Sequence, residues 1–178
     1  VYIPVNGNAL SCEFKAVPVS HVPAPKRLPK PLIAGVHNAI VIGPSSSKVG
    51  DIACDNQGRV MVEFFWDSSE GNSGYIRVSE PFAGKSYGAQ FTPRVGQEVL
   101  VSFLHGDPDA PVVTGQVYTE KHKPPFAEKN TTKSGFKTQL HGDPNELVFD
   151  DKEGGELIAM HAAKDYELIV AENADRDI

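Results

Sequence analysis

Apolar and polar residues alternate along five segments in the middle of the chain, with the period of two that is typical of half-buried β-strands. Because five short strands with almost no helical periodicity do not suit a βαβ fold, the pattern predicts an all-β protein built on a small closed barrel. The strand order fits an OB-fold, although the pattern alone leaves an SH3-like barrel open. The five segments are His37–Ile42, Arg59–Trp66, Tyr75–Glu80, Gln97–Leu104 and Val112–Tyr118.

Alternation also predicts which side chains fill the barrel. In one strand it puts Phe64 and Trp66 on the core-facing side with Val60 and Val62. In another it only separates two faces, one with Val99, Val101 and Phe103 and one with Glu98, Leu100, Ser102 and Leu104. The connection His105–Pro111 should be a tight turn and not a helix, because Pro108 restricts Asp107 and Gly106 can take a positive φ. Asp51–Ala53 is a possible short strand, and Pro81–Pro93 is irregular, with a short helix left open.

The segment before the barrel differs in composition. It begins with a predicted turn at Asn6–Asn8 and a predicted strand at Ser11–Val17. From Pro18 to Pro31 prolines are so frequent that the chain should be extended and act as a semi-rigid linker, in preference to a docking ligand.

After the barrel the pattern becomes one of short strands that recur about every ten residues, separated by charged or glycine-containing turns. The predicted rungs are Phe136–Leu140, Glu146–Asp150, Leu157–Ala162 and Tyr166–Val170, and they follow a second linker at Thr119–Gly135. Such rungs have too little apolar surface to fold alone. We therefore expect a β-helix that other chains complete.

Charge and composition narrow the function classes. The chain of 178 residues has a net charge of −6, which argues against binding to nucleic acid. Its two cysteines, Cys12 and Cys54, form neither a zinc pattern nor a disulfide framework, which favours synthesis in a reducing compartment. We find no run long enough for a transmembrane helix and no signal peptide. Because the sequence starts at Val1 without methionine, we expect a piece of a longer protein.

Candidate chemistry is weak. His141 and His161 lie near several carboxylates, but their spacing fits no metal signature, and turn or surface roles explain them better. The tetrapeptide His-Gly-Asp-Pro at 105–108 recurs at 141–144, where a turn is again the simpler explanation. Neighbouring carboxylates such as Asp150 and Asp151 have no cleft-bearing domain around them. We expect no catalytic, cofactor-binding or metal-binding residue, and no enzymatic activity.

An OB-fold that binds oligonucleotides needs exposed aromatic side chains beside basic residues. Phe64, Phe65 and Trp66 supply aromatic rings, but alternation assigns Phe64 and Trp66 to the core and their neighbours include the acidic Glu63 and Asp67. An oligonucleotide-binding module therefore stays a distant alternative.

The stretch Pro93–Tyr118, PRVGQEVLVSFLHGDPDAPVVTGQVY, closely resembles the core of the VgrG family, the trimeric spike proteins of type VI secretion systems. It is similar, more distantly, to the spikes of contractile-tail phages. Further matching stretches are Gln57–Asp67, Ile76–Gly84 and Leu157–Val170. The resemblance implies four parts: the end of a hub-like domain with a proline-rich linker at 1–34, an OB-fold barrel at 35–118, a linker at 119–135, and the first rungs of a trimeric β-helical needle at 136–178.

It also implies a structural function, as the membrane-puncturing spike of a contractile injection machine. The implied partners are two further copies in a homotrimer, a PAAR-type tip protein, the tail-tube protein and effectors, with no nucleic acid. The protein would be made in the bacterial cytoplasm, assembled on the apparatus and secreted into the target cell or medium. A tail spike of a contractile phage or prophage is the nearest alternative.

Periodicity predicts which rung residues line the trimer axis, since the more apolar face of each strand should turn inward. The predicted trimer core is Leu147, Phe149, Ile158, Met160, Leu168 and Val170.

Overall fold

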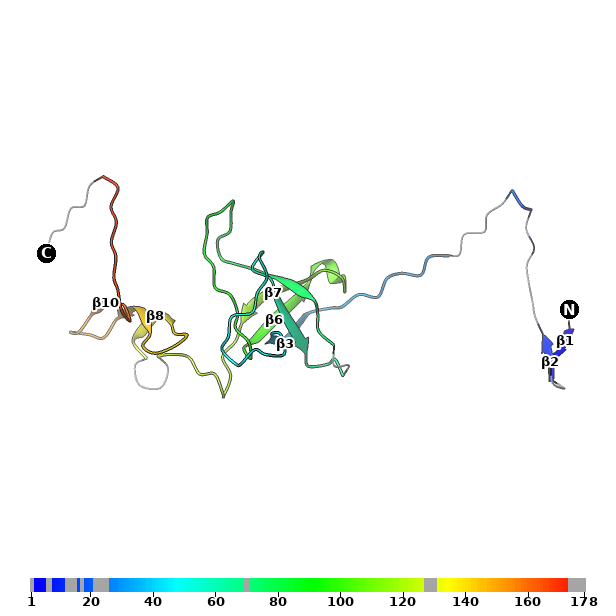
Figure 1. Ribbon diagram of the computed structural model, residues 1–178, viewed down its shortest axis with the longest axis horizontal. Coiled ribbons are helices and arrows are strands. Elements are labelled where there is room, and N and C mark those ends of the chain that lie inside the picture. The colour runs from blue at the N-terminus through cyan, green and yellow to red at the C-terminus, as the bar shows by residue number, and fades with distance from the viewer. Residues whose placement is uncertain are drawn as a thin grey trace. The chain divides into compact units, whose positions relative to one another are not determined.

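The computed structural model describes residues 2–5, 8–11, 16, 18–20, 26–68, 71–126 and 131–172 (Figure 1). The chain divides into two units, Val1–Pro31 and Leu32–Ile178. In the first unit, β1 (Tyr2–Val5) pairs with β2 (Asn8–Ser11) as an antiparallel hairpin. Most of the predicted strand Ser11–Val17, and Asn6 and Gly7 of the predicted turn, lie outside the described residues.

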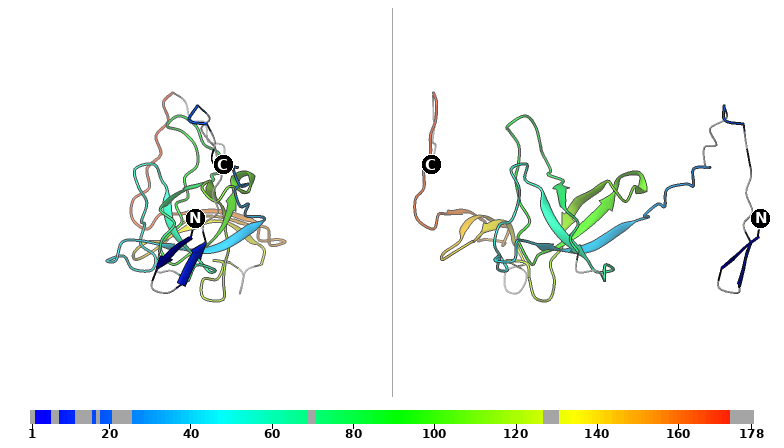
Figure 2. Two further views of the ribbon diagram at one scale, coloured as in Figure 1. Left: turned by 90° about the vertical axis from the view of Figure 1, so that its right-hand side faces the viewer. Right: turned by 45° about the vertical axis from the view of Figure 1, so that its right-hand side comes forward.

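The second unit contains the predicted barrel, drawn in cyan to yellow-green in Figure 2, and the pairing of its strands confirms that it is closed. The order around the barrel is β3-β4-β5-β7-β6, in which every neighbouring pair is antiparallel except the parallel pair β5–β7. Within the described ranges the regular elements are strands and one 3-10 turn, so the protein is all-β. The barrel strands are β3 (Val36–Ile42), β4 (Val60–Phe64), β5 (Tyr75–Val78), β6 (Glu98–Phe103) and β7 (Pro111–Gln116).

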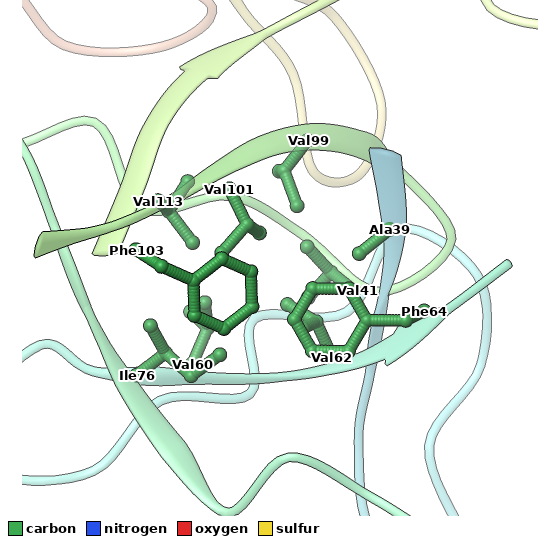
Figure 3. Packing of buried hydrophobic residues seen from close by; sticks show 10 residues of the cluster. All are labelled: Ala39, Val41, Val60, Val62, Phe64, Ile76, Val99, Val101, Phe103 and Val113. Atoms are coloured by element: carbon green, nitrogen blue, oxygen red, sulfur yellow. The ribbon is translucent and has the colours of Figure 1, made fainter. Parts of the chain in front are cut away.

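Alternating residues from all five strands fill the barrel (Figure 3). The predicted inward face of β4 is confirmed for Val60, Val62 and Phe64. Of the two faces of β6, the one with Val99, Val101 and Phe103 turns inward. Most of the core side chains are β-branched, which suits a pleated surface that curves into a barrel. The rings of Phe64 and Phe103 stack with centroids 5.8 Å apart and fill the space between the valines.

The prediction that Trp66 faces the core is wrong. β4 ends at Phe64, and the chain then turns, with the Asp67 amide donating to the Phe64 carbonyl. Beyond the end of a strand the alternation of faces no longer holds. Trp66 is 57% exposed, and its ring stacks on Phe64 with centroids 4.8 Å apart.

The connection after β6 is a tight turn, as predicted, with one difference. It begins with a single 3-10 turn, η1 (Leu104–Gly106), where no helix was expected. Gly106 has the expected positive φ, of 73°, and the φ of His105 is also positive, at 55°. Asp51–Ala53 forms no strand, although the next residue, Cys54, makes an isolated bridge to Val60. Pro81–Pro93 contains no helix.

A three-stranded antiparallel sheet, here called the rung sheet, follows the barrel. Its strands are β8 (Lys133–Thr138), β9 (Asn145–Asp150) and β10 (Leu157–His161), in the order β10-β9-β8. The first rung therefore begins three residues earlier than predicted, inside the predicted linker. Within the described residues no β-helical winding is visible, and the three strands of the rung sheet form a meander.

The fourth predicted rung is wrong for the isolated chain. Tyr166–Val170 is described but forms no strand. A strand needs a partner for its backbone hydrogen bonds, and within the described residues β10 pairs only with β9. Among the described residues, no helix has the length and apolar character needed to cross a bilayer.

Candidate assembly site

One face of the rung sheet is apolar across all three strands. Residues directly opposite one another in an antiparallel sheet point to the same face. Phe136 lies opposite Leu147, which lies opposite Met160, and Phe149 lies opposite Ile158. We call the face formed by these five residues the assembly face.

The assembly face is largely uncovered in the single chain. Ile158 and Met160 are 69% and 67% exposed, and Phe136 and Phe149 are also exposed, whereas Leu147 is half-buried. A contiguous apolar surface of this kind on a small sheet marks an interaction site. The sheet therefore presents an apolar face that a single copy of the chain leaves in water.

The opposite face carries lysine–carboxylate pairs together with the apolar residues Val148 and Leu157. The Lys137 ammonium lies 2.8 Å from the Glu146 carboxylate, and the Lys133 ammonium lies 3.9 Å from the carboxylate of Asp150. The hydrogen bond from Lys137 lowers the pKa of Glu146 below its usual value, so this carboxylate stays ionised in the folded sheet. Between the charged pairs Val148 is buried. The two faces thus differ in chemistry as alternation predicts.

The structure brings together four of the six predicted core residues, namely Leu147, Phe149, Ile158 and Met160, on one face. Leu168 and Val170 are exposed and lie outside the strands. Their place at a trimer axis stays a prediction, as does that of the other four. Phe136 joins the same face although sequence reasoning did not select it. The signal that places it there is the register of β8 against β9.

Gly135 is essential to the pairing of β8 with β9. Its φ is +143°, and a Cβ added there would lie 2.0 Å from the Leu147 carbonyl oxygen. We expect Gly135→Ala to destabilise the sheet by at least about 1–3 kcal/mol, because both the backbone and the neighbouring strand must shift. Hydrogen exchange of the β8 and β9 amides measures the effect.

The matched control for this variant is Gly155→Ala. A Cβ at Gly155 would meet only Lys152 atoms at 3.8 Å or beyond, and the φ of Gly155 is not positive. Equal acceleration of exchange in both variants would contradict the role assigned to Gly135.

The candidate chemical groups have structural partners. His161 Nδ1 donates to the Pro144 carbonyl at 2.8 Å, which ties β10 to the turn before β9. His141 lies in that same turn, so the turn prediction for both His-Gly-Asp-Pro segments is supported. Across the described residues, no group of three or more His, Cys, Asp or Glu side chains is arranged to hold a metal ion.

An open depression of about 720 Å³ lies between the turn at 56–58 and the loop at 80–90. Its lining is mostly neutral and includes one carboxylate, that of Glu80. One oxygen of this carboxylate accepts the Phe91 amide at 3.0 Å. The lining offers no second carboxylate to pair with that of Glu80 for acid–base chemistry.

Residues 48–118 match the family model of the type VI secretion system/phage-baseplate injector OB domain. The match covers β4 to β7, and the closed five-strand order is consistent with an OB-fold domain.

Relatives narrow this class further. The chain is 40% identical over 90% of its length to the type VI secretion system spike protein VgrG3 of Vibrio cholerae, and 41% identical over 92% to VgrG5 of Pseudomonas aeruginosa. It is also 40% identical over 80% of its length to the actin cross-linking toxin VgrG1 of V. cholerae. The predicted resemblance to the VgrG family is thereby confirmed. The chain spans only 16%, 21% and 13% of the lengths of these three proteins.

Proposed function

We propose that this chain forms the central section of a homotrimeric, membrane-puncturing spike of a type VI secretion system. The observation that carries the proposal is the assembly face, which is apolar over three strands and uncovered in one copy. The names of the similar proteins support the assignment to a spike.

Within the described ranges, the isolated rung sheet has an uncovered apolar face and two edge strands without outer partners, and a trimer would provide for both. Its three copies would bury the assembly faces against one another, and they would offer pairing partners to the edge strands β8 and β10. Residues such as Tyr166–Val170 would then gain the backbone partners that a strand requires. The result is a narrow rod held by many hydrogen bonds, which suits mechanical puncture.

In the complete protein the proposed partners are the tail-tube protein, a PAAR-type tip protein and effectors, in addition to the two other copies. The proposed route is synthesis in the bacterial cytoplasm, assembly on the injection apparatus, and secretion into the target cell or the medium. We propose no catalytic role for this segment. Three of the candidate groups in the rung sheet, His161, Glu146 and Asp150, each make a structural contact. The matching family also includes phage-baseplate domains, so a phage or prophage tail spike is the second candidate.

Sedimentation equilibrium of the purified chain tests the trimer. We expect a species of three times 19.2 kDa. If assembly is weak, residues after about Gly135 should be protease-sensitive in the monomer while the barrel survives, since low local stability exposes the backbone to cleavage. A strictly monomeric chain at micromolar concentration whose rung sheet is nevertheless protected would contradict the proposal.

A further inference from the structure

Two residues of the loop before β6 contact the rung sheet. The ring of Phe91 stacks on the ring of Phe136 in β8, with centroids 5.7 Å apart and an angle of 10° between the ring planes. The guanidinium of Arg94 donates to the carbonyl of Gln139, just after β8. The barrel and the rung sheet are therefore joined by side chains as well as by the covalent linker between them.

On the barrel side, both residues are fixed to barrel strands or to the loops between them. The Phe91 amide donates to the Glu80 carboxylate at 3.0 Å, just after β5, and the Phe91 carbonyl accepts the Gln116 side chain, from β7, at 3.3 Å. The Arg94 amide donates to Oε1 of Gln97 at 2.8 Å, immediately before β6. These bonds hold the backbone of both residues against the barrel, so their side chains project from a fixed base.

On the sheet side, the contacts reach the assembly face and the turn that follows β8. Phe136 begins the row that continues through Leu147 and Met160. The Gln139 side chain donates to the Gly142 carbonyl at 2.6 Å, so the carbonyl that receives Arg94 belongs to an ordered turn. Phe91 therefore packs on the assembly face at β8, which is an edge strand of the rung sheet.

We propose that Phe91 and Arg94 form a joint that fixes the first strand of the rung sheet to the barrel, in parallel with the covalent linker. The inference rests on the proposed spike function, in which force on the barrel must reach the needle. A linker of irregular chain alone would bend under compression. A stacked aromatic pair beside a charge-assisted hydrogen bond resists both sliding and separation.

Hydrogen exchange on the full chain tests the joint. We expect Phe91→Ala to accelerate exchange of the β8 amides by about tenfold, because a lost aromatic stack shifts a local opening equilibrium by about that factor. Phe136→Ala should do the same from the sheet side, and the double variant should add little, since both changes remove one contact. Amides of β3 and β6 should be unchanged, which shows that the barrel remains folded.

The matched control is Phe82→Ala. Phe82 is also an exposed phenylalanine of the β5–β6 loop, but its ring packs on Tyr87, with centroids 5.6 Å apart. Unchanged β8 exchange in Phe91→Ala, additive effects of Phe91 and Phe136, or equal acceleration in the Phe82 variant would overturn the joint. Native mass separates this result from the proposed function: a trimeric wild type with no Phe91 effect refutes the joint alone, whereas a monomer with the effect refutes the spike assembly alone.

Discussion

Replacing Ile158 by glutamate is expected to convert the proposed trimer into monomers. Ile158 is 69% exposed in one copy and lies opposite Phe149 on the assembly face. In a trimer the substitution would bring three like charges together near one axis. Burying each ion costs several kcal/mol unless it is neutralised. Sedimentation equilibrium and the melting temperature of the variant measure the loss.

Ala159→Glu is the neighbouring control, because it places the same charge on the opposite face. Ala159 lies opposite Val148, between the two lysine–carboxylate pairs, and is half-buried. We expect a small loss of stability with the trimer retained. The result that contradicts the assembly face is the reverse: an unchanged trimer in Ile158→Glu and a lost one in Ala159→Glu, which would mean that the opposite face turns inward.

Ile76→Ala should destabilise the barrel by about 2–5 kcal/mol, the range measured for removing a large aliphatic side chain from a packed core. Ile76 is 2% exposed and is among the largest fully enclosed side chains of the barrel. The closed order of strands leaves little room for the neighbouring valines to collapse into the cavity. Urea denaturation followed by far-ultraviolet circular dichroism gives the change in the free energy of unfolding.

The next residue supplies the comparison. Arg77 is exposed on the outside of β5, and Arg77→Ala should change the free energy of unfolding by no more than about 0.5 kcal/mol. If the Ile76 variant unfolds at the same urea concentration as the Arg77 variant, β5 does not contribute its inward residue to the core.

Much of the barrel could be predicted because each strand carries its own two-residue alternation. Val60, Val62 and Phe64 were placed correctly from that local pattern, and all three are buried. The alternation gave wrong predictions where the chain is not a paired β-strand. Trp66 continues the alternation of β4 in sequence, but the strand stops at Phe64. Tyr166–Val170 alternates as well, yet it has no backbone partner within the described residues.

The assembly face was predicted in part for the same reason. Alternation assigns Leu147 and Phe149 to one face of their strand, and Ile158 and Met160 to one face of the next. Only the register between the strands puts these four residues on the same face of the sheet. The register of β8 against β9 adds Phe136 to that face. The stack of Phe91 on Phe136 could not be predicted at all, because no local sequence pattern indicates a contact between a barrel loop and a later sheet.

The closure of the barrel by β3 and β6 sets an order for folding during synthesis. β3 can pair with β4 early, but Val36 pairs with Ser102, so the barrel cannot close until β6, its fourth strand, has left the ribosome. Contacts this distant in sequence form slowly, because a long loop must close first. The rung sheet pairs only consecutive strands, β8 with β9 and β9 with β10, so its own pairing does not wait for a distant segment. Its exposed apolar face would then be present before the other copies arrive, and this interval is when a newly made chain is most prone to aggregate.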